Sequence, residues 1–118
     1  MKEAYCSFKI AKLLKEKGFN ISLDSKNWLC CMYDENGNIK WGCYDENWYF
    51  RITHQMAIAL LREKNISIEP SALNNHSWCY GIYKLLNNKV KELYNDGDFD
   101  SYEEAVEAAL EYYLINFI

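Results

Sequence analysis

The stretch SYEEAVEAALEYYLINF, residues 101–117, decides the fold of this chain more than any other. Ser101 followed by Glu104 is a capping box, in which the serine oxygen accepts a backbone N–H and the glutamate reaches back. Apolar side chains then recur at helical spacing and predict a helix with one buried face, formed by Val106, Ala109, Leu110, Tyr113 and Phe117. The opposite face is expected to be solvated and carries Glu103, Glu104, Glu107 and Glu111.

Two more helices are predicted upstream by the same kind of signal. Ser7 precedes an apolar stripe, and Gly18 suits the left-handed residue that ends a helix, which predicts a helix over 8–17. Thr53 begins another helix, which is expected to run to about Lys64.

The remaining segments have strand and turn composition. Residues 28–33 and 39–44 flank Asn36-Gly37, a strong hairpin signal. Residues 66–70 alternate like a strand and close at Pro70. Residues 77–94 fit a helical stripe or a hairpin turning at Asn87-Asn88, and we predict the hairpin. The result is an α+β fold, with three helices packed on a small antiparallel sheet of about four to five strands. No linker divides the chain, so we predict one domain over residues 1–118.

Composition excludes several classes of protein. The 118 residues carry 13 Lys+Arg and 17 Asp+Glu, a net charge of −4, and half are hydrophobic, which excludes disorder as the main state. No apolar run is long enough for a membrane span, and because the chain lacks a basic stripe we do not expect nucleic acid as a partner. The first residues lack the apolar core of a signal peptide, and the five cysteines are odd in number, so we expect reduced thiols and a cytoplasmic protein.

Three segments, residues 7–19, 53–63 and 100–110, carry a resemblance to known proteins. In their order and spacing they resemble a group of short, uncharacterised proteins encoded by phages, prophages and related mobile elements of gut anaerobes. That group often has Pro before the threonine that opens the middle helix and Trp where Leu60 stands, whereas this chain has Ile52 and Leu60. The resemblance implies a small α+β fold and a mobile-element setting, and it implies no activity.

Aromatic residues are the unusual part of the composition, at 16% of the chain. Trp and Tyr are the residues that anchor protein interfaces. We predict that a cluster around the first hairpin is exposed for binding, formed by Trp28, Trp41, Trp48 and Tyr49; the alternative is that these side chains are core. The expected partner is an unidentified protein, and the chain itself is a monomer or a homodimer.

Metal and nucleophile patterns are incomplete in this sequence. Asp96, Asp98 and Asp100 alternate, and Glu107 stands twelfth from Asp96, as in a calcium-binding loop, but Ser101 replaces the glycine of the sixth position. We therefore expect no metal and no cofactor. His54, at the start of a helix, is expected to be solvated, and no spacing orients Cys79 toward a histidine.

We therefore predict a non-enzymatic protein that acts by binding another protein. The first alternative is an acidic nucleic-acid mimic that blocks a host DNA-binding enzyme, with residues 96–111 as its only dense run of carboxylates. The second alternative is a small-ligand-binding protein or an enzyme whose pocket is formed only by the fold.

Overall fold

The computed structural model describes residues 4–19, 30–42 and 44–118. The helices in these ranges are α1 (Phe8–Glu16), α2 (His54–Arg62) and α3 (Tyr102–Asn116). The strands are β1 (Cys30–Tyr33), β2 (Ile39–Gly42), β3 (Tyr49–Phe50), β4 (Ile66–Ala72), β5 (Trp78–Leu86) and β6 (Lys89–Phe99). The predicted α+β class with three helices is confirmed. The described residues form six strands, which make two antiparallel sheets of three, ordered β2-β1-β3 and β4-β5-β6, in place of a single sheet.

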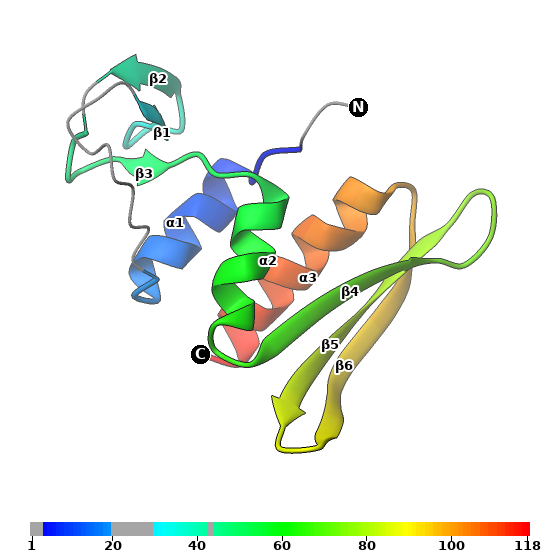
Figure 1. Ribbon diagram of the computed structural model, residues 1–118. Helices are drawn as coiled ribbons and strands as arrows, with labels where there is room; N and C mark the ends of the chain where they lie inside the picture. Colours follow the sequence, from blue (N-terminus) through cyan, green and yellow to red (C-terminus); the bar gives the residue numbers. More distant parts are fainter. Residues whose placement is uncertain (1–3, 20–29, 43) are drawn as a thin grey trace.

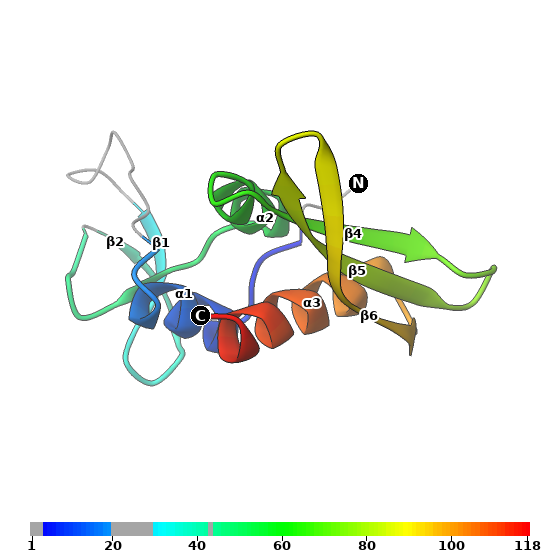
Figure 2. The same cartoon turned by 90° about the horizontal axis from the view of Figure 1, so that it is seen from below.

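Both views place the two sheets at opposite ends of the molecule, with the helices between them (Figure 1, Figure 2). Helix α3 is the central element, because it contacts α1, α2 and all three strands of the second sheet. Its side chains without exposed surface are Ala105, Val106, Ala109, Leu110 and Leu114. Phe117, predicted to be buried, is instead the exposed C-cap of α3, beyond the last turn that packs on the sheet.

The three predicted helix starts are confirmed by their caps. The side-chain oxygens of Ser7, Thr53 and Ser101 each accept a backbone N–H from the first turn of their helix, a contact typically worth about 1 kcal/mol. In α3, Glu104 reaches back to the N–H of Asp100, one residue earlier than the usual capping box. No helix of the described ranges is long and apolar enough to cross a bilayer.

The hairpin predicted for residues 77–94 is confirmed as β5 and β6, which turn at Asn88 in the left-handed conformation. Strand β6 continues to Phe99, so the acidic segment expected to be a loop lies largely on a strand. A bulge opposite Cys79 accommodates it, and Asp98 takes the left-handed conformation there, with φ of 67°. Strand β4 runs past Pro70 to Ala72, which an outer strand of a sheet tolerates.

The first hairpin, β1–β2, is closed by a turn at Asp34. Its Oδ1 accepts the backbone N–H groups of Asn36 and Asn38, both at 2.9 Å, and Gly37 supplies a φ of 85°. Residues 28 and 29 of the predicted first strand lie outside the described residues. The hydrogen bonds from Asn38 and Asn36 hold the pKa of the Asp34 carboxyl below its ordinary value.

Replacing Asp34 with Asn is expected to remove an acid-dependent part of the stability. A lowered pKa in the folded state means that the charged carboxylate stabilises the fold above the unfolded pKa of about 3.9, and that this contribution disappears as the pH falls through the lower folded value. Melting temperatures of both proteins are to be measured from about pH 2 to 7, on either side of that value. The gap between the two curves should close toward acid; a constant gap would contradict the assignment.

Candidate functional site

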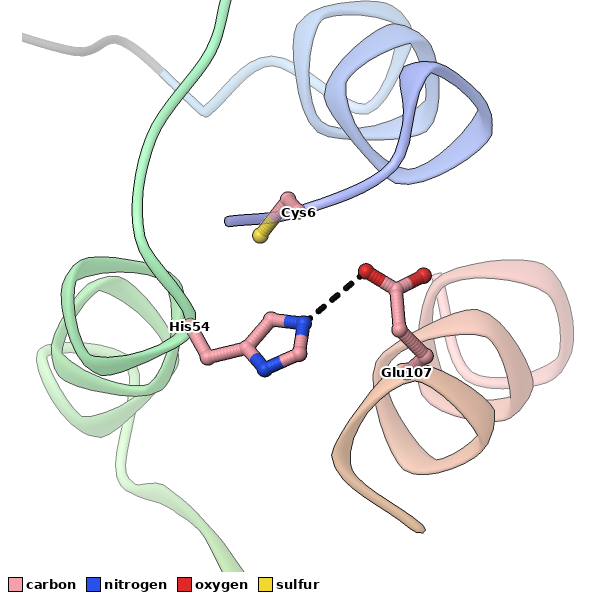
Figure 3. Close-up of side chains that lie close together, drawn as sticks. All are labelled: Cys6, His54 and Glu107. Carbon is pink, nitrogen blue, oxygen red and sulfur yellow. Dashed lines mark hydrogen bonds and ion pairs between the residues drawn. The ribbon is translucent and has the colours of Figure 1, made fainter. Parts of the chain in front are cut away.

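The N-terminal segment, the start of α2 and the middle of α3 meet at one place in the structure. Residues 4–6 run antiparallel to residues 52–54, with a bridge between Tyr5 and Thr53. The Cys6 N–H donates to the Ile52 carbonyl at 2.8 Å, and the His54 N–H donates to the Ala4 carbonyl at 2.9 Å. This pairing sets Cys6 beside His54, and Glu107 of α3 points toward both side chains (Figure 3).

Glu107 binds two of these segments to α3. Its Oε1 lies 2.9 Å from Nε2 of His54 and accepts the Ser7 N–H at 2.8 Å, while its Oε2 accepts the Ser7 hydroxyl at 2.9 Å. The serine hydroxyl thus gives its only proton to Glu107 and keeps a lone pair for the N–H of Ile10. Burial by itself raises the pKa of Glu107, but the hydrogen bonds from His54 and Ser7 outweigh it and hold the pKa below its ordinary value.

Cys6 is a buried thiol with little nucleophilic character. Burial, and secondarily the negative charge of Glu107, raise the pKa of Cys6 to about 12, so at neutral pH the group is a thiol rather than a thiolate. Its Sγ lies 3.8 Å from the Thr53 carbonyl, to which it donates. Since the thiolate is the attacking species, Cys6 is not activated in this arrangement.

His54 does not connect Cys6 to Glu107 as the base of a catalytic triad would. In a triad one ring nitrogen serves the nucleophile and the other serves the acid. Here Nε2 faces Glu107, while Nδ1 lies on the side of the ring away from Cys6 and has no hydrogen-bond partner among the described residues (Figure 3). The donor atoms of Cys6, His54 and Glu107 instead converge, all within 4.8 Å of one another.

An open cavity of about 570 Å³ lies against this group. Its lining residues include all three members of the cluster, Ser7, the aromatic residues Tyr5 and Tyr33, Arg51, and three further glutamates of α3, Glu103, Glu104 and Glu111. The guanidinium of Arg51 lies over the Tyr5 ring, 4.0 Å from its centroid. The lining of the cavity therefore combines glutamates from α3 with a cationic side chain and aromatic rings from other segments.

Two predictions about this region are wrong. His54 is only 3% exposed, because the N-terminal segment and α3 cover it, and it is not a solvated residue. Glu107, predicted to face solvent, is covered in part by Ser7 and His54. No local pattern reports either contact, since His54 and Glu107 are separated by 53 positions and the bridge at Tyr5 involves a single residue pair.

The predicted calcium ligands are not brought together. Asp96 and Asp98 lie on β6, Asp100 precedes the cap of α3, and Glu107 turns toward His54. In the described part of the chain, the only group of three or more His, Cys, Asp or Glu residues with ligand atoms close enough to share a metal is Cys6, His54 and Glu107. Cys79 lines a separate cavity of about 370 Å³ with Asp96 on the outer face of the second sheet, and His76 is exposed.

The predicted aromatic cluster is divided by the structure. Trp41 is 71% exposed on β2. Trp48 is half-buried, and its Nε1 donates to Oε2 of Glu35 at 3.1 Å. Tyr49 is also half-buried, with its ring against Phe8 and under the Lys15 ammonium. Trp28 lies outside the described residues, so Trp41 is the member of the cluster that the structure exposes.

The fold and the site define a small α+β protein with a buried thiol–imidazole–carboxylate cluster beside an open cavity. No protein-family model matches the chain, and neither the curated proteins nor the solved structures contain a match. Its function is therefore inferred from its own side chains.

Proposed function

We propose that this chain is a non-enzymatic binding protein, and that a partner protein docks on the exposed apolar side chains of β2, Trp41 and Ile39. The observation that carries the proposal is the exposure of Trp41, at 71%, beside Ile39 at 50%. A tryptophan side chain buries a large area and is enriched at the energetic centres of interfaces. While Trp41 is exposed to water, its apolar surface contributes little to the stability of the fold, and burial of that surface by a partner would contribute to binding.

The register of the first sheet sets the direction of this surface. Trp41 stands opposite Cys31 and Ile39 opposite Tyr33, so all four side chains project from one face of the sheet. Tyr33 also lines the 570 Å³ cavity. The sheet face that carries Trp41 and Ile39 therefore also contributes one lining residue to the cavity.

The side chains around the site favour protein binding over a nucleic-acid mimic and over an enzyme that uses Cys6 as its nucleophile. A nucleic-acid mimic needs a dense run of carboxylates free to replace phosphates, and two members of the run are engaged in other contacts: Glu107 is bonded to Ser7 and His54, and Glu111 is 2.5 Å from the Lys9 ammonium. An enzyme using Cys6 needs a thiolate and a bridging base, and the cluster offers neither.

The free thiols Cys6, Cys31 and Cys79 fit a reducing compartment, so the cytoplasm remains the proposed location. The mobile-element setting remains a prediction from the resemblance.

Replacing Trp41 with Ala is expected to abolish capture of the partner. The tagged chain, its Trp41→Ala variant and a Lys40→Ala variant would be incubated with nuclease-treated host lysate at low and moderate salt, and the bound proteins quantified by mass spectrometry. Lys40 is the control, because it is exposed on the same strand and projects from the opposite face. With the partner purified, loss of a central tryptophan contact of at least about 2 kcal/mol corresponds to binding about 30-fold weaker.

Three outcomes of this experiment distinguish the proposed function from its alternatives. A partner held by the wild type and by Lys40→Ala but lost from Trp41→Ala supports the proposal, and self-association with the same dependence makes the partner a second copy of the chain. A basic partner that ignores Trp41 and leaves with salt favours the nucleic-acid mimic. Equal capture by all three proteins contradicts a role for Trp41.

A further inference from the structure

We propose that Cys6, His54 and Glu107 form a binding site for a single Zn²⁺ ion. The inference is independent of the surface at Trp41 and rests on the convergence of three different donor atoms: Sγ of Cys6, a ring nitrogen of His54 and a carboxylate oxygen of Glu107, all within 4.8 Å of one another. The three residues come from separate segments of the chain, and their side chains meet in the space between those segments (Figure 3).

The donor set selects the class of metal. Zinc in proteins binds cysteine as the thiolate, histidine nitrogen and carboxylate oxygen, so binding at this site releases the Cys6 thiol proton to solvent. Calcium and magnesium take oxygen ligands, usually six or more for calcium, and a thiol with an imidazole disfavours both. The cluster therefore fits zinc, or a first-row metal that substitutes for it, and it does not fit the calcium ion considered from the aspartates of residues 96–100.

The spacing of the atoms is close to that of a tetrahedral site. Two ligands bound at about 2.0–2.1 Å in tetrahedral geometry are about 3.3 Å apart, and Nε2 of His54 lies 2.9 Å from Oε1 of Glu107. With a metal–sulfur bond of about 2.3 Å, the sulfur needs to stand about 3.6 Å from each of the others. The sulfur lies at most 4.8 Å from the other two donor atoms, so a shift of about 1 Å by the thiol brings it to the distance that the metal requires.

Contacts other than the metal hold Cys6 and Glu107 in place, whereas Nδ1 of His54 has no hydrogen-bond partner among the described residues. The backbone of Cys6 is fixed on both sides, since its N–H donates to Ile52 and its carbonyl accepts the Tyr33 hydroxyl at 2.6 Å. Glu107 keeps its Oε2 on the Ser7 hydroxyl, and its Oε1, which also accepts the Ser7 N–H, can bind the metal with the lone pair that now faces His54. Outer contacts of this kind orient ligands and support affinity in metalloproteins.

The fourth coordination position of the metal faces the open side of the cluster. All three ligands line the 570 Å³ cavity, so a water molecule or a ligand from solvent can complete the coordination. A zinc site with three protein ligands and one exchangeable position differs from the closed, four-ligand structural type.

Metal titration of the purified chain tests the proposal. The protein, stripped with a chelator and kept reduced, would be titrated with Zn²⁺ by calorimetry and with Co²⁺ by absorption spectroscopy. We expect one ion per chain, a tetrahedral visible spectrum and a sulfur-to-cobalt charge-transfer band. The Cys6→Ser variant should lose that band and bind at least about 100-fold more weakly, and Glu107→Gln should also weaken binding. Cys79→Ser and His76→Gln, which change a thiol and an imidazole outside the cluster, should bind as the wild type does.

A second measurement keeps the test decisive if Cys6→Ser does not fold. X-ray absorption of the zinc-loaded wild type should show one sulfur ligand at about 2.3 Å with nitrogen or oxygen ligands at about 2.0 Å. Absence of stoichiometric binding, a charge-transfer band that survives Cys6→Ser, or a zinc with no sulfur or with several sulfur ligands would each overturn the proposal.

Discussion

Replacement of Leu110 by Ala is expected to lower the free energy of unfolding by about 3–5 kcal/mol, near the upper end of the range for buried leucines. Leu110 has no exposed surface, and it belongs to a buried cluster that draws on α1, α2, β4, β5 and α3. Because α3 contacts helices as well as the second sheet, it cannot move toward one neighbour to fill the space without opening a gap toward the other. The cavity term is therefore expected to be retained in full.

Urea unfolding followed by circular dichroism measures this loss, with Ile115→Ala as the matched control. Ile115 lies on the same helix, is 49% exposed and is outside the buried cluster, so its truncation should cost less than about 1 kcal/mol. An unchanged dependence on urea in both variants would show that the unfolded states are equally open. A loss at Leu110 no larger than that at Ile115 would mean that α3 is not the centre of the fold.

The parts of the fold that sequence predicts are those with a local cause. Ser7, Thr53 and Ser101 cap helices through contacts with residues three positions later, so a short stretch of sequence is enough to predict them. The hairpin over residues 77–94 is likewise local, because its two strands are joined by a two-residue turn. These elements are present where the sequence places them.

The division of the strands into two sheets is not local. Strand β3 contains only Tyr49 and Phe50, too short for an alternating pattern, and its pairing with β1 follows from how the intervening chain folds. The bridge between Tyr5 and Thr53 involves one residue pair, which is too short to produce a pattern in the sequence. Since this bridge brings Cys6 to His54, the site was beyond the reach of periodicity and motif spacing.

Glu107 shows why a charged residue on a helix is ambiguous in sequence. Glu103, Glu104, Glu107 and Glu111 have the spacing of a solvated face, and that spacing is the same whether water or another segment covers the helix. Only the position of the N-terminal segment decides that Glu107 meets Ser7 and His54 while Glu103 stays exposed. Trp41 is ambiguous in the opposite direction: it is a large aromatic residue of a kind that is often buried, and the structure leaves it exposed to solvent.

Replacement of Glu107 by Ala, measured in the presence of a chelator, is expected to lower the free energy of unfolding by about 2–3 kcal/mol. The carboxylate accepts two hydrogen bonds from Ser7 and one contact from His54, and hydrogen bonds to charged groups are the stronger kind. Without it, Nε2 of His54 joins Nδ1 as a buried ring nitrogen that lacks a protein partner, and the start of α1 loses its tie to α3. Glu107→Gln should cost less, because the amide oxygen can still accept from Ser7.

Glu103→Ala is the control for this substitution, since Glu103 lies one turn earlier on α3 and is exposed. Both changes replace a glutamate by the best helix former, and Glu103, which lies in the first turn of α3, also loses a favourable interaction with the helix dipole of at most about 1 kcal/mol. The difference between the two variants is therefore a lower bound on the contribution of the contacts of Glu107 with the N-terminal segment and α2. If it is smaller than about 0.5 kcal/mol, those contacts do not hold the three segments together, and the cluster is assembled by the apolar packing around it.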